Sequence, residues 1–171
     1  MKVLIPIRCT EFLDANVEKS IKAQTFATEI ELFLNSPMSQ YKRKGEFEGR
    51  DAIIKRVDSI IDPYVVTNDS HAKHLFIDNF QCMYDALEND EKLGAVSLWR
   101  SNGAMAHPAD KHMTLSCVMW RTKVLSRMPL LHVKEIYEAG HCCCNTYKAA
   151  VESQGYSMRF LDGIKRINES D

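Results

Sequence analysis

The chain has 171 residues, of which 45% are hydrophobic and 26% are charged, which is typical of a soluble globular protein and excludes a disordered or fibrous one. Its formal net charge of −1 gives no overall signal for nucleic acid or for a membrane surface. No apolar run approaches the roughly 20 residues that a bilayer span needs, and residues 1–7 are too short for the core of a signal peptide. We therefore expect one domain, over residues 1–171, in the cytoplasm.

Two kinds of segment alternate along the chain, short β-branched or alternating apolar runs that predict strands and apolar positions at helical spacing that predict helices. In chain order they are a strand over 2–7, a helix over 11–23, a strand over 30–34, a helix over 50–61, a strand over 64–67, a helix over 72–89, strands over 94–99 and 113–120, helices over 121–127 and 133–153, and a strand over 155–161. Polar residues 38–49 and 100–111 predict loops, and the charged tail 165–171 is expected to be frayed. The alternation predicts an α/β fold with a mostly parallel central sheet and helices on both faces.

The six cysteines do not form a recognisable framework. Cys142–Cys144 are consecutive, and Cys9, Cys82 and Cys117 are scattered through apolar segments. There is no Cys-x-x-Cys pair for zinc, and adjacent thiols on a helix point about 100° apart. We expect reduced thiols that pack as small hydrophobic side chains.

The turn after the first predicted strand contains no glycine: it reads Arg8-Cys9-Thr10-Glu11. A Gly-x-Gly-x-x-Gly motif and a Walker-type loop are both absent from the sequence, which argues against a dinucleotide-dependent dehydrogenase and a P-loop NTPase. A nucleotidyltransferase would normally carry a glycine-rich loop here, so it is the least supported of the alternatives.

The third predicted strand runs directly into an acid and an imidazole two residues apart, Asp69 and His71. In extended chain such residues point to the same side, so both could face one point beyond the strand, where open α/β sheets bind ligands. A carboxylate and an imidazole together suit a divalent cation such as Mn²⁺. The competing interpretation is a simple turn, because Asn-Asp-Ser is ordinary turn chemistry, and on these residues alone the turn is the better supported of the two.

A set of short motifs follows a fixed order from about residue 2 to residue 163. It comprises Val3-Leu4-Ile5-Pro6, Ser20, Ala23-Gln24-Thr25, Ile30-Glu31-Leu32-Phe33-Leu34-Asn35, Arg50, the segment from Asp62 to His71, Leu93-Gly94-Ala95-Val96-Ser97, Cys117-Val118-Met119-Trp120-Arg121 and the segment from Gly155 to Gly163. This ordered set resembles the family-2 glycosyltransferases, which open with an apolar strand ending in proline and a helix carrying a serine and a Gln-Thr pair. The resemblance implies a single GT-A (Rossmann-like) domain, a nucleotide-diphosphate sugar as donor, and Mn²⁺ or Mg²⁺ bound to the donor's diphosphate.

The resemblance also implies roles for individual residues. Contacts to the donor are expected from Pro6, Arg8, Asn35, Arg50, Asn68 and Asp69. The sequence Asp69-Ser70-His71, in place of Asp-x-Asp, is similar to the variant in polypeptide N-acetylgalactosaminyltransferases, where the acid, the histidine and a distal histidine bind Mn²⁺. We take His141 as the distal ligand, with His132, His112 and His107 as alternatives. Glu138 is the candidate general base if the reaction inverts the anomeric centre, and need not be a base if the reaction retains it. For His141 and Glu138 the competing interpretation is a solvent-facing helix residue.

Three departures from the family pattern leave a second hypothesis open. Asn35 replaces the usual acid after the second strand, Asp69-Ser70-His71 replaces the metal motif Asp-x-Asp, and the chain ends where many relatives continue into acceptor-binding elements. These features favour a catalytically degenerate GT-A module that binds or scaffolds. The acceptor of an active enzyme, whether a saccharide, a metabolite, a protein or a modified nucleic-acid base, is not encoded in a recognisable motif, and neither is the oligomeric state.

Overall fold

A computed structural model describes residues 1–8, 12–35, 42–98, 117–130, 143–161 and 166–169. Its main sheet has six strands in the order β2-β1-β3-β6-β5-β7, and a second sheet pairs β4 with β8. The strands are β1 Lys2–Arg8, β2 Glu29–Asn35, β3 Tyr64–Asn68, β4 Ala72–His74, β5 Leu93–Ser97, β6 Cys117–Arg121, β7 Ser157–Phe160 and β8 Ile167–Glu169. The helices are α1 Ala15–Lys22, α2 Lys42–Val57, α3 Asn79–Asn89, α4 Thr122–Leu125 and α6 Cys143–Ser153.

The main sheet is mostly parallel, as predicted. β1 pairs in parallel with both β2 and β3, and β5 pairs in parallel with β7. β6 is antiparallel to both of its neighbours, β3 and β5. The carboxyl ends of β1, β2, β3, β5 and β7 therefore share one edge of the sheet, and β6 begins at that same edge.

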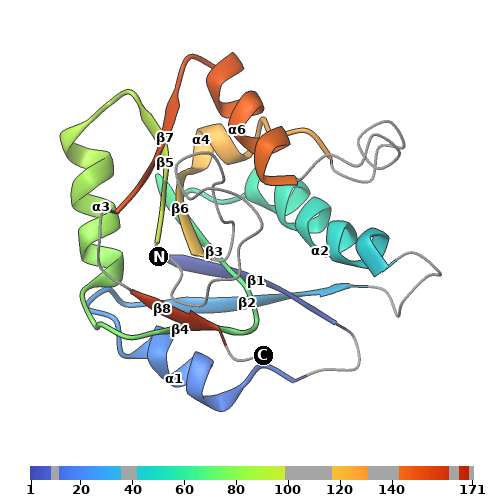
Figure 1. Cartoon of the computed structure of the whole chain (residues 1–171), viewed down its shortest axis with the longest axis vertical. Coiled ribbons are helices and arrows are strands. Elements are labelled where there is room, and N and C mark those ends of the chain that lie inside the picture. Colours follow the sequence, from blue (N-terminus) through green and yellow to red (C-terminus); the bar gives the residue numbers. More distant parts are fainter. Residues whose placement is uncertain (9–11, 36–41, 99–116, 131–142, 162–165, 170–171) are drawn as a thin grey trace.

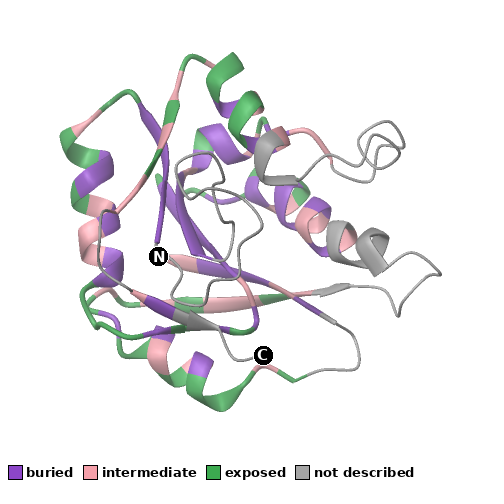
Figure 2. Ribbon diagram, in the orientation of Figure 1, coloured by how far each residue is buried: buried purple, intermediate pink, exposed green. Residues whose placement is uncertain are grey.

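Successive residues of the central strands enter two separate cores, because side chains alternate across a strand. Leu4 and Val65 pack with α2, α4 and α6, whereas Val3, Ile5 and Val66 pack with α1, α3 and the small sheet. Figure 1 shows α2 and α3 on opposite sides of the sheet, and Figure 2 shows the buried residues along the sheet and on the inner sides of the helices. The expected helices on both faces are confirmed.

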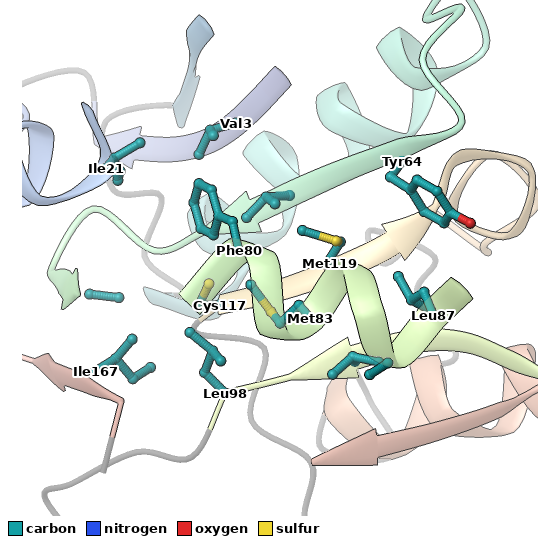
Figure 3. Close-up of a cluster of buried hydrophobic side chains, with 14 of the residues drawn as sticks. Val3, Ile21, Tyr64, Phe80, Met83, Leu87, Leu98, Cys117, Met119 and Ile167 are labelled. Carbon is teal, nitrogen blue, oxygen red and sulfur yellow. The ribbon is translucent and has the colours of Figure 1, made fainter. Parts of the chain in front are cut away.

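The core on the α3 side is built from long apolar side chains of α3 and β6 (Figure 3). Phe80, Met83 and Leu87 lie along one side of α3 and are fully buried against Met119. Each such side chain contributes about 1.5–3 kcal/mol when it leaves water. On the other side of the sheet Trp120 is equally buried, and its indole nitrogen donates to Thr67 Oγ1 at 2.8 Å.

Several predicted boundaries were wrong in the first third of the chain. The helix predicted over 11–23 begins at Ala15, because the Asp14 carboxylate accepts backbone hydrogen bonds from Asn16 and Val17 and caps it. The loop predicted over 38–49 is wrong from Lys42 onward, where α2 begins; α2 then ends at Val57 rather than at residue 61. The polar composition of this segment suggested a loop, but Lys, Arg and Glu are good helix formers and α2 packs on β1 and β2.

The helix predicted over 72–89 and the frayed tail are corrected together. Ala72–His74 form strand β4, and only Asn79–Asn89 are helical. β4 pairs antiparallel with β8, with His74 opposite Ile167, so part of the tail is a strand. Both segments are strands because they pair with each other, although more than 90 residues separate them in the sequence. The local spacing of apolar residues carries no information about such a distant pairing.

Replacing Ile167 by alanine is expected to lower the free energy of unfolding by about 2–4 kcal/mol, because this side chain is fully buried in the core. A frayed tail would lose no more than about 0.5 kcal/mol. Urea denaturation measures the difference, with Leu32→Ala as control, since Leu32 is also a strand residue but is 46% exposed. Equal losses in the two variants would contradict the docking of β8.

Among the residues that the structure describes, no helix is both long and apolar enough to cross a membrane.

Candidate functional site

The candidate site lies at the edge of the sheet where β1, β2 and β3 end. Arg8 and Asn35 are register partners at the ends of β1 and β2. In the pairing of β1 with β3, Leu4 lies opposite Thr67. Pro6 follows Leu4 by two residues and Asp69 follows Thr67 by two residues, so Pro6 and Asp69 lie at the same level of the sheet. The predicted donor-contacting residues of three strands are therefore neighbours at one edge, which is where open α/β sheets bind ligands.

Asp69 and His71 lie in a tight turn and not in extended chain. The Ala72 backbone N–H donates to the Asp69 carbonyl at 3.0 Å, which closes a four-residue turn. Ser70 is buried within it and His71 is exposed. The premise of extended backbone was wrong, because the turn chemistry of Asn-Asp-Ser prevails. Both predicted ligands nevertheless stay on one short segment beyond β3.

Arg50 and Asp69 form an ion pair across the site. Arg50 Nη2 lies 2.9 Å from Asp69 Oδ1, and the two side chains are only 16% and 32% exposed. Arg50 comes from the middle of α2, and Asp69 follows β3, so two residues predicted to meet the donor are brought into direct contact by different elements. Partial burial strengthens such a charge-assisted hydrogen bond relative to a surface pair.

Asn68 is fully buried, and its amide is bonded within the chain. Its Nδ2 donates to the carbonyls of Asp69 at 2.9 Å and Ala72 at 3.0 Å, and its Oδ1 lies 3.2 Å from His74 Nε2. The side chain predicted to contact the donor therefore holds the turn that carries Asp69. Sequence reasoning missed His74, because the segment around it was predicted to be helical; its place in a β-strand depends on β8.

The other predicted residues are placed less completely. Pro6 is half-buried within β1, and Arg8 and Asn35 are placed by their backbone at the strand ends. Glu138 and His141 lie outside the described residues, as do the alternative histidines His107, His112 and His132. Among the residues described, no group of three or more His, Cys, Asp or Glu side chains could hold a metal ion.

The donor set of the turn fits a borderline divalent cation. Asp69 offers a half-buried carboxylate and His71 an imidazole, and oxygen with imidazole nitrogen is a combination that Mn²⁺ accepts. Two protein ligands leave most of the coordination sphere to a bound diphosphate, as in sites where the cation is held chiefly by substrate phosphates. The residues present are therefore compatible with a cation that binds together with a phosphorylated ligand.

No protein-family model matches the sequence, and the search of curated proteins found no similar one. Solved structures do match. A mannosyltransferase from Pyrobaculum calidifontis, PcManGT, in complex with GDP-Man and Mn²⁺ superimposes with a TM-score of 0.66 at 12% identity, over 98% of this chain and 56% of that one. S. aureus TarS (residues 1–349) in complex with UDP-GlcNAc gives a TM-score of 0.64 at 12% identity, over 99% of this chain and 58% of that one.

A CMP:2-keto-3-deoxy-manno-octonic acid synthetase in complex with CTP also matches, with a TM-score of 0.53 at 10% identity, over 96% of this chain and 92% of that one. The chain thus spans little more than half the length of the two glycosyltransferases above. These identities establish architecture only. The chain has a GT-A fold, which it shares with these structures.

Proposed function

We propose that this chain is the donor-binding domain of a metal-dependent glycosyltransferase, which moves a sugar from a nucleotide-diphosphate sugar to an acceptor hydroxyl or amine. The contact between Arg50 and Asp69 carries the proposal, because it joins two residues expected at the donor at the ligand-binding edge of a GT-A sheet. The nucleotide-sugar complexes of PcManGT and TarS support it by analogy of fold.

In this proposal Asp69 and His71 hold Mn²⁺ or Mg²⁺, with His141 as a further ligand. The cation would supply charge stabilisation for the diphosphate leaving group. Arg50, one contact away, is a planar cation suited to bind phosphate oxygens. Without a ligand, its guanidinium compensates the carboxylate charge of Asp69. Glu138 is the proposed base that removes the acceptor proton.

The second candidate is the GT-A module that binds or scaffolds without catalysis. Asn35 at the end of β2, where family-2 enzymes usually have an acid, is the observation in its favour. A nucleotidyltransferase is the third, since the match to the CTP-bound synthetase covers 92% of that chain. The chemistry of the preferred nucleotide separates the three candidates.

Titration calorimetry of the chain with UDP, GDP, dTDP and CTP, each with and without Mn²⁺, tests the proposal. We expect one nucleoside diphosphate to bind, with an affinity that rises at least tenfold on adding Mn²⁺, and the bound nucleotide to raise the melting temperature. Hydrolysis or transfer of the matching nucleotide sugar would then separate an enzyme from a scaffold. Tighter binding of CTP than of every diphosphate would favour the nucleotidyltransferase, and binding of none would overturn the donor site.

A further inference from the structure

Three polar side chains beneath the turn are fully buried and take no part in the proposed chemistry. Asn68 and Asn79 are 0% exposed and His74 is 5% exposed. Burying such groups is unfavourable unless every hydrogen-bonding atom finds a partner. Their hydrogen bonds therefore show what this cluster holds in place.

The hydrogen bonds run in one direction through the cluster. Asn79 Nδ2 donates to His74 Nδ1 at 2.9 Å, so the ring proton sits on Nε2, which donates to Asn68 Oδ1 at 3.2 Å. Asn68 Nδ2 then donates to the carbonyls of Asp69 and Ala72, the first and last residues of the turn. Both hydrogens of the Asn68 amide are used, and both end on the turn.

The imidazole is fixed in its neutral form and in its orientation. Burial lowers the pKa of His74 to about 3, so the ring keeps one donor and one acceptor at neutral pH. The edge of the Phe80 ring packs against it, with the ring centres 4.9 Å apart. The backbone N–H of His74 donates to Ser20 Oγ at 3.0 Å, which ties the residue to α1.

The far end of the cluster is attached to the C-terminal segment. Asn79 Nδ2 also donates to the Arg166 carbonyl at 2.9 Å, and Arg166 Nη1 donates to Asn79 Oδ1 at 3.1 Å. The next residue, Ile167, pairs with His74 in the small sheet. Residues nearly one hundred positions after the turn therefore hold the base of the cluster.

We propose that Asn68, His74 and Asn79 form a buried clamp of positioning residues that sets the Asp69–Ala72 turn for the donor diphosphate and its cation, with β8 closing the clamp from below. This inference rests on the proposed function. The three residues do not touch the donor: they act through the turn, whose carbonyls they hold.

Three variants separate positioning from general stability. His74→Phe keeps a ring against Phe80 but removes both side-chain hydrogen bonds, and His74→Gln offers an amide that can again donate to Asn68. The matched control is Thr67→Val, which removes the buried hydrogen bond from Trp120. Thr67 precedes Asn68 in β3, but its side chain faces the other core, which contains Trp120.

The first measurement is hydrogen exchange of the free chain, which needs neither donor nor metal. We expect His74→Phe to accelerate exchange of the Ala72 amide, the one that closes the turn, by on the order of tenfold relative to the Val66 amide in β3. Thr67→Val should leave that ratio unchanged, and His74→Gln should restore part of it. Equal ratios in His74→Phe and Thr67→Val would overturn the clamp.

The second measurement is the Mn²⁺-dependent affinity for the nucleoside diphosphate that the wild type binds. Loss of a residue that supports a metal ligand typically costs about 10–100-fold in affinity, and we expect His74→Phe to lose this much and Thr67→Val to lose little. Equal affinities in the two variants, with a wild type that binds, overturn the clamp alone. A wild type that binds no nucleotide overturns the proposed function instead, while the exchange ratio still decides whether the clamp fixes the turn.

Discussion

Replacing Asp69 by asparagine is expected to lower the Mn²⁺-dependent affinity for a nucleoside diphosphate by on the order of 100-fold or more. The substitution keeps the size of the side chain and removes its charge, which both the cation and Arg50 require. Outer residues that only orient a metal ligand are worth about 10–100-fold, so loss of the ligand itself should reach or exceed that range. Titration calorimetry of the variant, with and without Mn²⁺, gives the change directly.

The chain offers a matched control for this variant in a second ion pair of α2. Arg56 Nε lies 2.8 Å from Glu31 Oε1. The Glu31 side chain is 30% exposed, close to the 32% of the Asp69 side chain. Glu31→Gln therefore breaks an equivalent pair elsewhere on the sheet and should leave nucleotide binding unchanged. If Asp69→Asn and Glu31→Gln bind the nucleotide equally well, Asp69 has no role in metal binding.

The fold was predictable from the sequence where the signal was local. The β-branched runs of β1 and β3 and the apolar stripe of α3 are dictated by burial on one or two sides, and burial leaves a pattern in the sequence. β4 and β8 were missed because each is only three residues long and is a strand only through its pairing with the other. The start of α2 was missed because its first residues are polar, without the apolar stripe that marks an amphipathic helix.

Sequence motifs likewise predicted one part of the candidate site, and the other part depends on tertiary contacts. The order of motifs predicted that Arg50 and Asp69 would share one site, and in the structure Arg50 Nη2 lies 2.9 Å from Asp69 Oδ1. The clamp beneath them could not be predicted, because Asn79 and His74 are ordinary polar residues until the β4–β8 pairing buries them. The sequence motifs therefore indicated which charged residues lie close together at this edge of the sheet, and tertiary contacts decide what holds them there.

The buried imidazole of His74 also predicts a marked loss of stability in mild acid. Its pKa is lowered by burial to about 3 in the folded chain, against 6.5 for an exposed histidine. Between these values the unfolded chain binds a proton at this residue that the folded chain does not. The free energy of unfolding should therefore fall as the pH falls, by about 1.4 kcal/mol per pH unit for one proton.

The groups around the ring reinforce this direction. The nearby Cys117 thiol, whose own pKa burial raises, cannot compensate a positive charge on the ring. Asp69, whose charge helps to raise the pKa of the Cys117 thiol, is already paired with Arg50. Accommodating an imidazolium would also break its acceptor bond from Asn79, because Nδ1 would then carry a proton.

Urea denaturation from pH 6.5 to 5.0 isolates this titration. We expect the wild type to lose about 1.7 kcal/mol of unfolding free energy over this interval through His74 alone. His74→Phe has no titratable ring and should lose about that much less over the same interval, although it is the less stable protein at neutral pH. The carboxylates with lowered pKa values, Asp14 and Glu29, start from 3.8 and 4.5, so their contributions fall at more acidic pH than this window. Parallel pH profiles for the two proteins would contradict a neutral buried His74. A difference between the two pH slopes that corresponds to one bound proton would show that the acid sensitivity of the fold originates in His74, the side chain that holds the Asp69–Ala72 turn.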